Sequence, residues 1–90
     1  MLSPFEMSVP SDARYRVLAP EVAAKYAVLA GCSEEDAKSV QADVERAAAD
    51  LAAGGGEIAM VFGIDAGELQ VRLNCGMQSA TVRRSLPAAK

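Results

Sequence analysis

Few residues of this 90-residue sequence could carry out chemistry. Histidine is absent, which excludes a histidine general base, a histidine metal ligand and a Ser-His-Asp triad. The two cysteines, Cys32 and Cys75, are too few for a disulfide scaffold or a zinc site. We expect both to be small buried apolar side chains, and a disulfide would require the two to lie close in space.

Arginines on two predicted strands are the remaining candidates. Gln70 and Arg72 alternate with apolar residues, and so do Thr81 and Arg83, which predicts that all four side chains share one polar face of a sheet. Such a face is either simply solvated or a docking surface for an acidic protein partner. Nucleic acid is not expected as a partner, because the net charge is −3 and no aromatic platform accompanies the arginines.

Length and composition predict one domain over residues 1–90, with frayed ends at 1–4 and 88–90. Hydrophobic residues make up 51% of the chain, but so many are alanines that the core must be thin. No stretch approaches the ~18 apolar residues of a membrane helix, so no membrane partner is expected. The segment Met1–Pro10 contains Glu6 and lacks a basic leader, which argues against a signal peptide and makes the cytoplasm the default location.

A first helix is predicted after Ser11 and Asp12, which offer an N-cap. Pro20 predicts a kink, or a short turn before a helix over 20–30 that Gly31 ends. One apolar face is expected at spacings of three and four residues, formed by Tyr15, Leu18, Val22, Tyr26 and Leu29.

A second helix is predicted to begin at Ser33, because this serine cap is followed by the acids Glu34, Glu35 and Asp36 in the first turn. Gly54-Gly55-Gly56 ends it. Its expected apolar face consists of Ala37, Val40, Val44, Ala47, Ala48 and Leu51.

Alternating apolar and polar residues predict strands at Phe5–Val9, Glu68–Asn74 and Ser79–Leu86. A further strand is predicted at Glu57–Phe62, where Ile58, Met60 and Phe62 share one face and both faces are apolar. Turns are expected at Asp65-Ala66-Gly67 and at Gly76-Met77-Gln78. The order strand, helix, helix, strand, strand, strand predicts an α+β fold. We expect a two-layer α/β sandwich in which two helices pack on one face of a mostly antiparallel sheet.

The order of these elements, together with the residues at their junctions, resembles the ATPase (Bergerat) fold of anti-sigma-factor serine kinases and histidine-kinase-like ATPases. The resemblance covers most of the chain. Ser8-Val9-Pro10-Ser11 resembles the end of the family's first strand, and Ala42-Asp43-Val44-Glu45 resembles the stretch that holds its catalytic glutamate. Leu69–Leu73 resembles the strand before the adenine-binding loop, and Ser79–Pro87 resembles the final strand.

The family's nucleotide motifs are altered at the positions that the resemblance assigns to them. In place of Glu-x-x-x-Asn, the chain has Glu45 followed by Ala49, which cannot bind magnesium. In place of Asp-x-Gly-x-Gly it has Asn74 and Gly76 in Asn74–Gln78, and Asn74 would accept a hydrogen bond from adenine only weakly. A tight turn at Gly76–Gln78 stands where the family inserts a lid and a phosphate loop.

We therefore expect no catalytic residue, no metal and no nucleotide cofactor, with Glu45 a solvated charge that pairs with Arg46 or Lys38. The prediction is a non-catalytic regulatory or protein-interaction domain that has lost the nucleotide site. Its partner would be another protein or a second copy in a homodimer, for example through unpaired sheet edges. The alternative is an ATP-binding serine kinase of the anti-sigma type with a shortened site. A third possibility is a module of a larger complex without activity of its own.

Overall fold

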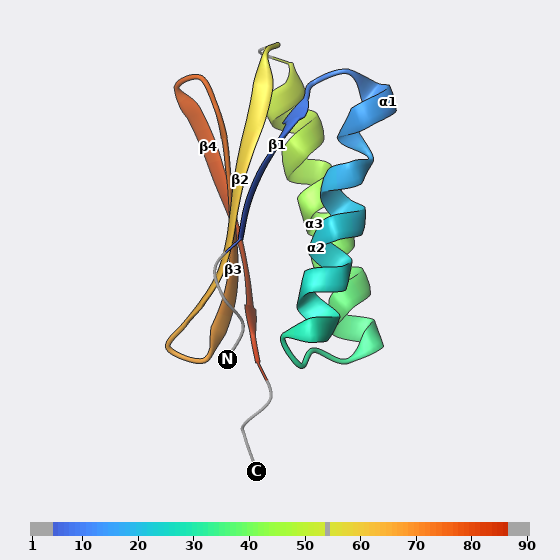
Figure 1. Ribbon diagram of the computed structural model, residues 1–90, viewed down its shortest axis with the longest axis vertical. Helices are drawn as coiled ribbons and strands as arrows, with labels where there is room; N and C mark the ends of the chain where they lie inside the picture. The colour runs from blue at the N-terminus through green and yellow to red at the C-terminus, as the bar shows by residue number, and fades with distance from the viewer. Residues whose placement is uncertain (1–4, 54, 87–90) are drawn as a thin grey trace.

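The computed structural model describes residues 5–53 and 55–86 (Figure 1). The predicted fraying at 1–4 and 88–90 lies outside these residues. In chain order the elements are β1 (Phe5–Pro10), α1 (Ala13–Arg16), α2 (Leu18–Leu29), α3 (Glu34–Ala52), β2 (Glu57–Asp65), β3 (Glu68–Cys75) and β4 (Gln78–Ser85). Apart from the single turn of α1, this is the predicted order.

The four strands form one antiparallel sheet in the order β1-β2-β3-β4. Ala66 and Gly67 connect β2 to β3 with positive φ angles of 53° and 76°, the pattern of a type I′ hairpin turn. Gly76 opens the next turn with a φ of 62°, a conformation that glycine adopts without steric cost. Within the described residues, β1 and β4 are the two edge strands.

Both long helices, α2 and α3, lie on the same face of the sheet (Figure 1). They pack against each other, and α3 also runs along β3 and β4. The other side of the sheet, which we call the open face, carries no further element within the described part of the chain. The predicted α+β fold with two layers and a helix pair on one sheet face is therefore confirmed.

The core lies between the sheet and the helices. Its centre is Phe62, which is fully buried and whose ring centroid lies 5.3 Å from that of Tyr26 and 5.6 Å from that of Phe5. The other large, fully buried strand residues that face the helices are Val9, Ile58, Met60, Leu69, Val71 and Leu73.

The predicted start and inner face of α3 are confirmed. The Ser33 side-chain oxygen accepts a hydrogen bond from the backbone N–H of Asp36 at 3.1 Å, as an N-cap does. Val40, Val44 and Ala48 are fully buried against the sheet side of the core.

The predicted turn before α2 and the end of α2 are confirmed as well. Pro20 lies in the first turn of α2, where a missing N–H costs nothing, and α1 is the short turn before it. Gly31, with a φ of 107°, ends the helix. The N–H of Cys32 donates to the carbonyl of Ala27 at 2.9 Å, and the N–H of Gly31 donates to that of Val28 at 3.0 Å, which together form a Schellman motif.

The predicted apolar face of α2, in contrast, was partly wrong. Tyr26 is buried, but Leu18 and Leu29 are 45% and 73% exposed. The core-facing side is instead made of small residues, Ala19, Ala23 and Ala27, which are fully buried. Alanines allow α2 to lie close to its neighbours, so the larger apolar side chains at helical spacing are left on the outer side.

Candidate interaction surfaces

The open face brings together the four residues that were selected from the sequence. In the pairing of β3 with β4, Gln70 lies opposite Arg83 and Arg72 lies opposite Thr81. Residues next to them along the strands, such as Val71 and Val82, are buried on the helix side. Because side chains alternate across a sheet, the four form a compact block on the open face.

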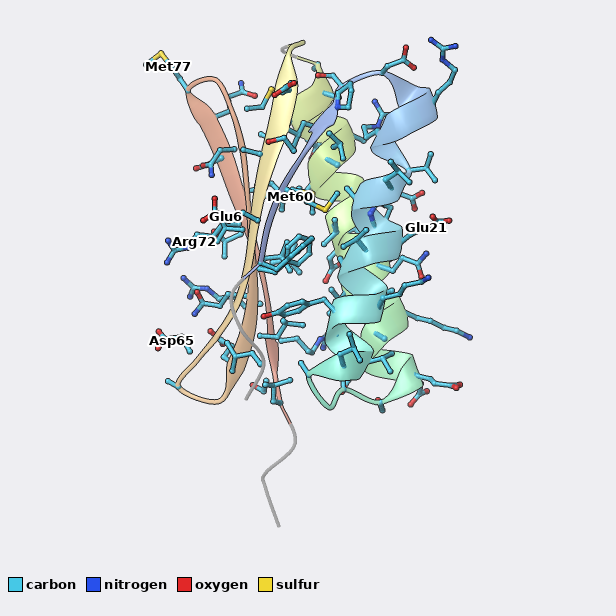
Figure 2. The ribbon with its side chains drawn as sticks, viewed as in Figure 1. Glu6, Glu21, Met60, Asp65, Arg72 and Met77 are labelled. Carbon is cyan, nitrogen blue, oxygen red and sulfur yellow. The ribbon has the colours of Figure 1, made fainter. Side chains whose placement is uncertain are left out.

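Two positive charges dominate this block. Arg72 and Arg83 are exposed, and neither takes part in an ion pair within the described residues. The Gln70 amide donates to a Glu68 carboxylate oxygen at 3.2 Å. Glu6 lies on the same face but two strands away from Arg72, roughly 10 Å across the sheet (Figure 2). Asp65 and Glu68 lie nearer, at the β2–β3 hairpin end of the same face, so the two arginines are the positive part of a face of mixed charge.

A hollow of about 260 Å³ lies beside this block, and it is lined by Val61, Gly63, Ile64, Asp65, Gln70 and Arg72. It exists because Gly63 has no side chain, and a Cβ placed there would meet no atom within 4 Å. The hollow has room for a small side chain of a partner, with the Arg72 guanidinium and the Gln70 amide at its wall.

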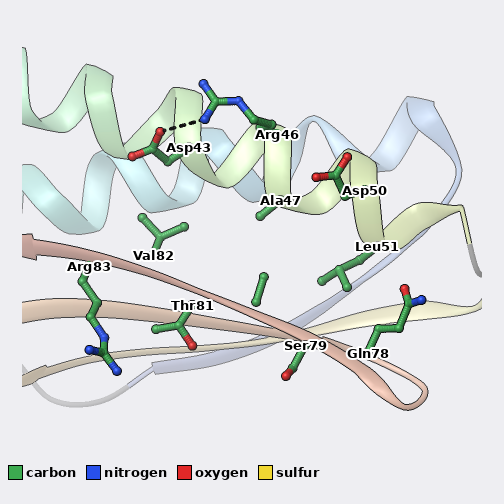
Figure 3. A pocket seen from close by; sticks show the side chains of 11 residues that line it. Asp43, Arg46, Ala47, Asp50, Leu51, Gln78, Ser79, Thr81, Val82 and Arg83 are labelled. Carbon is green, nitrogen blue, oxygen red and sulfur yellow. Dashed lines mark hydrogen bonds and ion pairs between the residues drawn. The ribbon is translucent and has the colours of Figure 1, made fainter.

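A larger groove of about 710 Å³ separates α3 from the edge strand β4 (Figure 3). On its helix wall, Arg46 donates to an Asp43 carboxylate oxygen at 3.5 Å, and the other oxygen of Asp43 lies 4.0 Å from Arg84. The expected pairing of Arg46 with Glu45 was wrong, because residues three apart on a helix face each other and adjacent residues do not. Arg84 lies on the helix side of β4, and the nearby Asp43 carboxylate compensates its positive charge there.

The positions assigned by the family resemblance are not brought together. Glu45 and Ala49 lie one turn apart on α3, beside a pocket of about 140 Å³ that they share with Arg16, Val17 and Pro20. Sites for small molecules usually measure roughly 300–1,000 Å³. Asn74 is exposed on the open face, between the buried Leu73 and Cys75, and the sheet therefore separates it from Glu45. Gly76 belongs to the turn that follows.

Both cysteines are buried, as the sequence predicted, and both are free. The Cys75 thiol donates to the carbonyl of Gly55 at 3.0 Å. Burial raises the pKa of the Cys32 thiol, Asp36 raises it further, and Arg84 acts in the opposite direction. A thiol that is held neutral is a weak nucleophile and a weak metal ligand. Within the described residues, no three acidic or cysteine side chains are grouped as a metal site would need.

Sequence reasoning missed the outer side of α2. Five exposed residues of α2 and the preceding Val17 form what we call the α2 stripe, namely Val17, Leu18, Glu21, Lys25, Val28 and Leu29. A signal was present in the sequence, because α2 contains only two charged residues, Glu21 and Lys25. A surface helix normally carries a continuous polar face.

No protein-family model matches this sequence, and no curated protein matches it. The resemblance to anti-sigma-factor ATPases therefore stays a prediction. Across residues 5–53 and 55–86, no helix combines the length and the apolar character needed to cross a membrane.

Proposed function

We propose that this chain is a non-catalytic, cytoplasmic protein-interaction domain whose open face binds an acidic segment of a partner protein. One observation carries the proposal. Arg72 and Arg83 stand exposed on neighbouring strands, without an ion pair in the described part of the chain, on a sheet face that nothing there covers.

The surroundings of the two arginines support a peptide or protein ligand. Gln70 and Thr81 add hydrogen-bonding groups directly across the strands from them. The hollow over Gly63 offers space for a side chain next to Arg72. Because Asp65 also lines this hollow, a neutral side chain of the partner suits it best, while an acidic neighbour in the partner segment would form a charge-assisted hydrogen bond with the Arg72 guanidinium, which is stronger than one between neutral groups.

The test uses two synthetic peptides of equal length that differ only in carrying glutamate or glutamine at alternate positions. Amide NMR spectra of the chain are recorded as each peptide is added. We expect the glutamate peptide to shift the amides of β3 and β4, with an affinity that falls as salt screens the charges. Arg72→Glu together with Arg83→Glu should weaken binding roughly tenfold or more.

Lys38→Glu is the matched control, because Lys38 is an exposed base of α3 on the helix layer. It should leave the affinity for the peptide unchanged. Equal binding of the glutamine peptide, or shifts confined to the helices, would contradict the proposal.

The alternative function, an ATP-binding kinase, makes a separate prediction. A ligand at 100 times its dissociation constant stabilises a protein by about 2.7 kcal/mol. We expect millimolar ATP with magnesium to leave the melting temperature unchanged. A rise in the melting temperature would favour the kinase over our proposal, because a ligand that binds the folded chain stabilises it.

A further inference from the structure

The α2 stripe contains an unusual share of the exposed apolar surface. Val17, Leu18, Val28 and Leu29 are 47%, 45%, 53% and 73% exposed. They form two pairs at the two ends of α2. A hollow of about 400 Å³, lined by Ala24, Lys25, Val28 and Leu29, lies at one of these ends. Solvated apolar side chains of this size, gathered on one helix face, mark a surface that another molecule covers.

The middle of the stripe is charged. Glu21 and Lys25 are exposed, and neither forms an ion pair within the described residues. Glu21 extends from the outer side of α2, away from the sheet (Figure 2). The stripe thus consists of an apolar pair, an acid, a base and a second apolar pair.

This sequence of side chains is symmetric about Ala23. Val17 and Leu29 are equally far from it along the helix, and so are Leu18 and Val28. Glu21 and Lys25 are the corresponding central positions, and they carry opposite charges. A face with this pattern is complementary to a copy of itself that runs in the opposite direction.

We propose that two copies of this chain associate through antiparallel packing of their α2 stripes, about a twofold axis that passes between the helices at the level of Ala23. At each end, Val17 and Leu18 of one protomer pack against the partner's Val28 and the partner's Leu29, where the hollow lies. In the middle, Glu21 faces the partner's Lys25, and Lys25 faces the partner's Glu21.

Charge selects this direction over the parallel one. In a parallel pair, equal positions meet, so Glu21 would face the partner's Glu21 and Lys25 the partner's Lys25. Like charges that face each other across the seam repel. The antiparallel pair converts both repulsions into attractions and still buries all four apolar side chains of each protomer.

The size of the seam predicts a weak dimer. From Val17 to Leu29 the helix is about 18 Å long, at 1.5 Å per residue. The seam involves the six stripe residues of each protomer, whereas a standard stable interface involves about 20–30 residues a side. We therefore expect a dissociation constant on the order of 10 μM or weaker. The open face lies on the opposite side of the sheet and stays free for its own ligand.

Sedimentation equilibrium over a wide range of protein concentration tests the dimer. Glu21→Lys should make the middle of the stripe uniformly positive, and Lys25→Glu should make it uniformly negative. Each variant should weaken self-association roughly tenfold or more, because in a twofold dimer every substitution alters two equivalent contacts. The double variant Glu21→Lys with Lys25→Glu should restore the dimer, and an equimolar mixture of the two single variants should form a heterodimer.

Leu29→Glu is a second variant that should abolish the dimer, since it introduces a charge at the most exposed apolar position of the stripe. Asp50→Lys is the matched control, an exposed acid on α3 whose change should leave the association constant as it was. Peptide binding to the open face should survive in all of them, which separates failure of this inference from failure of the proposed function. A monomer at millimolar concentration, or a dimer that the stripe variants leave intact, would overturn the inference.

Discussion

The two long helices, α2 and α3, cover the same face of the sheet, but they expose different kinds of residue to solvent. α3 has 19 residues, and eight of them are charged and gathered mostly on its outer side. α2 has 12 residues, of which only Glu21 and Lys25 are charged. α3 is thus a typical amphipathic helix, with a buried face of Val40, Val44 and Ala48 and a solvated polar face.

In α2 the usual relation between residue size and burial is reversed for the aliphatic residues, although Tyr26 is buried. Its small residues, Ala19, Ala23 and Ala27, face inward, while its large aliphatic residues at both ends face outward. The apolar face of α3 is therefore buried entirely within its own chain, whereas α2 has a second, exposed apolar face that is suited to packing against another molecule. The following predictions test this contrast.

The largest effect is expected from placing a charge on the inner face of α3. Val44→Asp buries an unpaired carboxylate where the native side chain is fully buried, at a cost on the order of 4 kcal/mol or more. Leu29→Asp, the paired change on the outer face of α2, should alter stability by roughly 0.5 kcal/mol or less in the monomer. Urea denaturation at low protein concentration measures both, and equal losses would contradict the contrast.

An intermediate effect is expected from enlarging the inner face of α2. Ala23→Leu adds a bulky side chain at a fully buried position and should destabilise the fold by about 1–3 kcal/mol. Ala24→Leu, the neighbouring substitution at a partly buried position, should cost much less. Thermal unfolding distinguishes the two. If Ala23→Leu were harmless, the inner face of α2 would not be packed as closely as we infer.

Sequence patterns located the elements because their signals are local. Ser33 begins α3 and Gly31 ends α2 through bonds to residues three to five positions away, and Gly67 and Gly76 set the hairpin turns. Alternation placed Arg72 on the correct side of its strand, since the partner strands share the same period.

The faces of α2 could not be predicted in the same way. Large apolar residues at helical spacing normally mark the core, and nothing local to Leu18 or Leu29 shows that alanines occupy that side instead. The ion pair of Asp43 with Arg84 was missed for a related reason, because it joins residues 41 positions apart. Contacts between elements depend on how the layers pack, which periodicity within one element does not determine.

A smaller effect is expected at the start of α3. Ser33→Ala removes the oxygen that accepts from the Asp36 N–H and should cost about 1 kcal/mol. Ser39→Ala, inside the same helix, is the matched control and should be neutral or slightly stabilising, because alanine has the higher helix propensity. Denaturant midpoints compare them. A loss at Ser39 as large as that at Ser33 would show that capping is not the cause.

The smallest effect concerns pH and the loop between the two helices. Burial, and after it Asp36, raises the pKa of the Cys32 thiol, so the folded state holds this proton more tightly than the unfolded state does. The resulting stabilisation is complete below the ordinary thiol pKa, and it is lost as pH rises from about 9 through the folded value. Cys32→Ala should therefore lose less stability than the native chain between neutral pH and this alkaline range.

Burial also raises the pKa of Tyr26, but Tyr26 is present in both proteins, so the difference between their urea midpoints isolates Cys32. Parallel pH profiles would mean that the thiol titrates alike in the folded and unfolded chains, and that the loop joining α2 to α3 is more open to water than the core beside it.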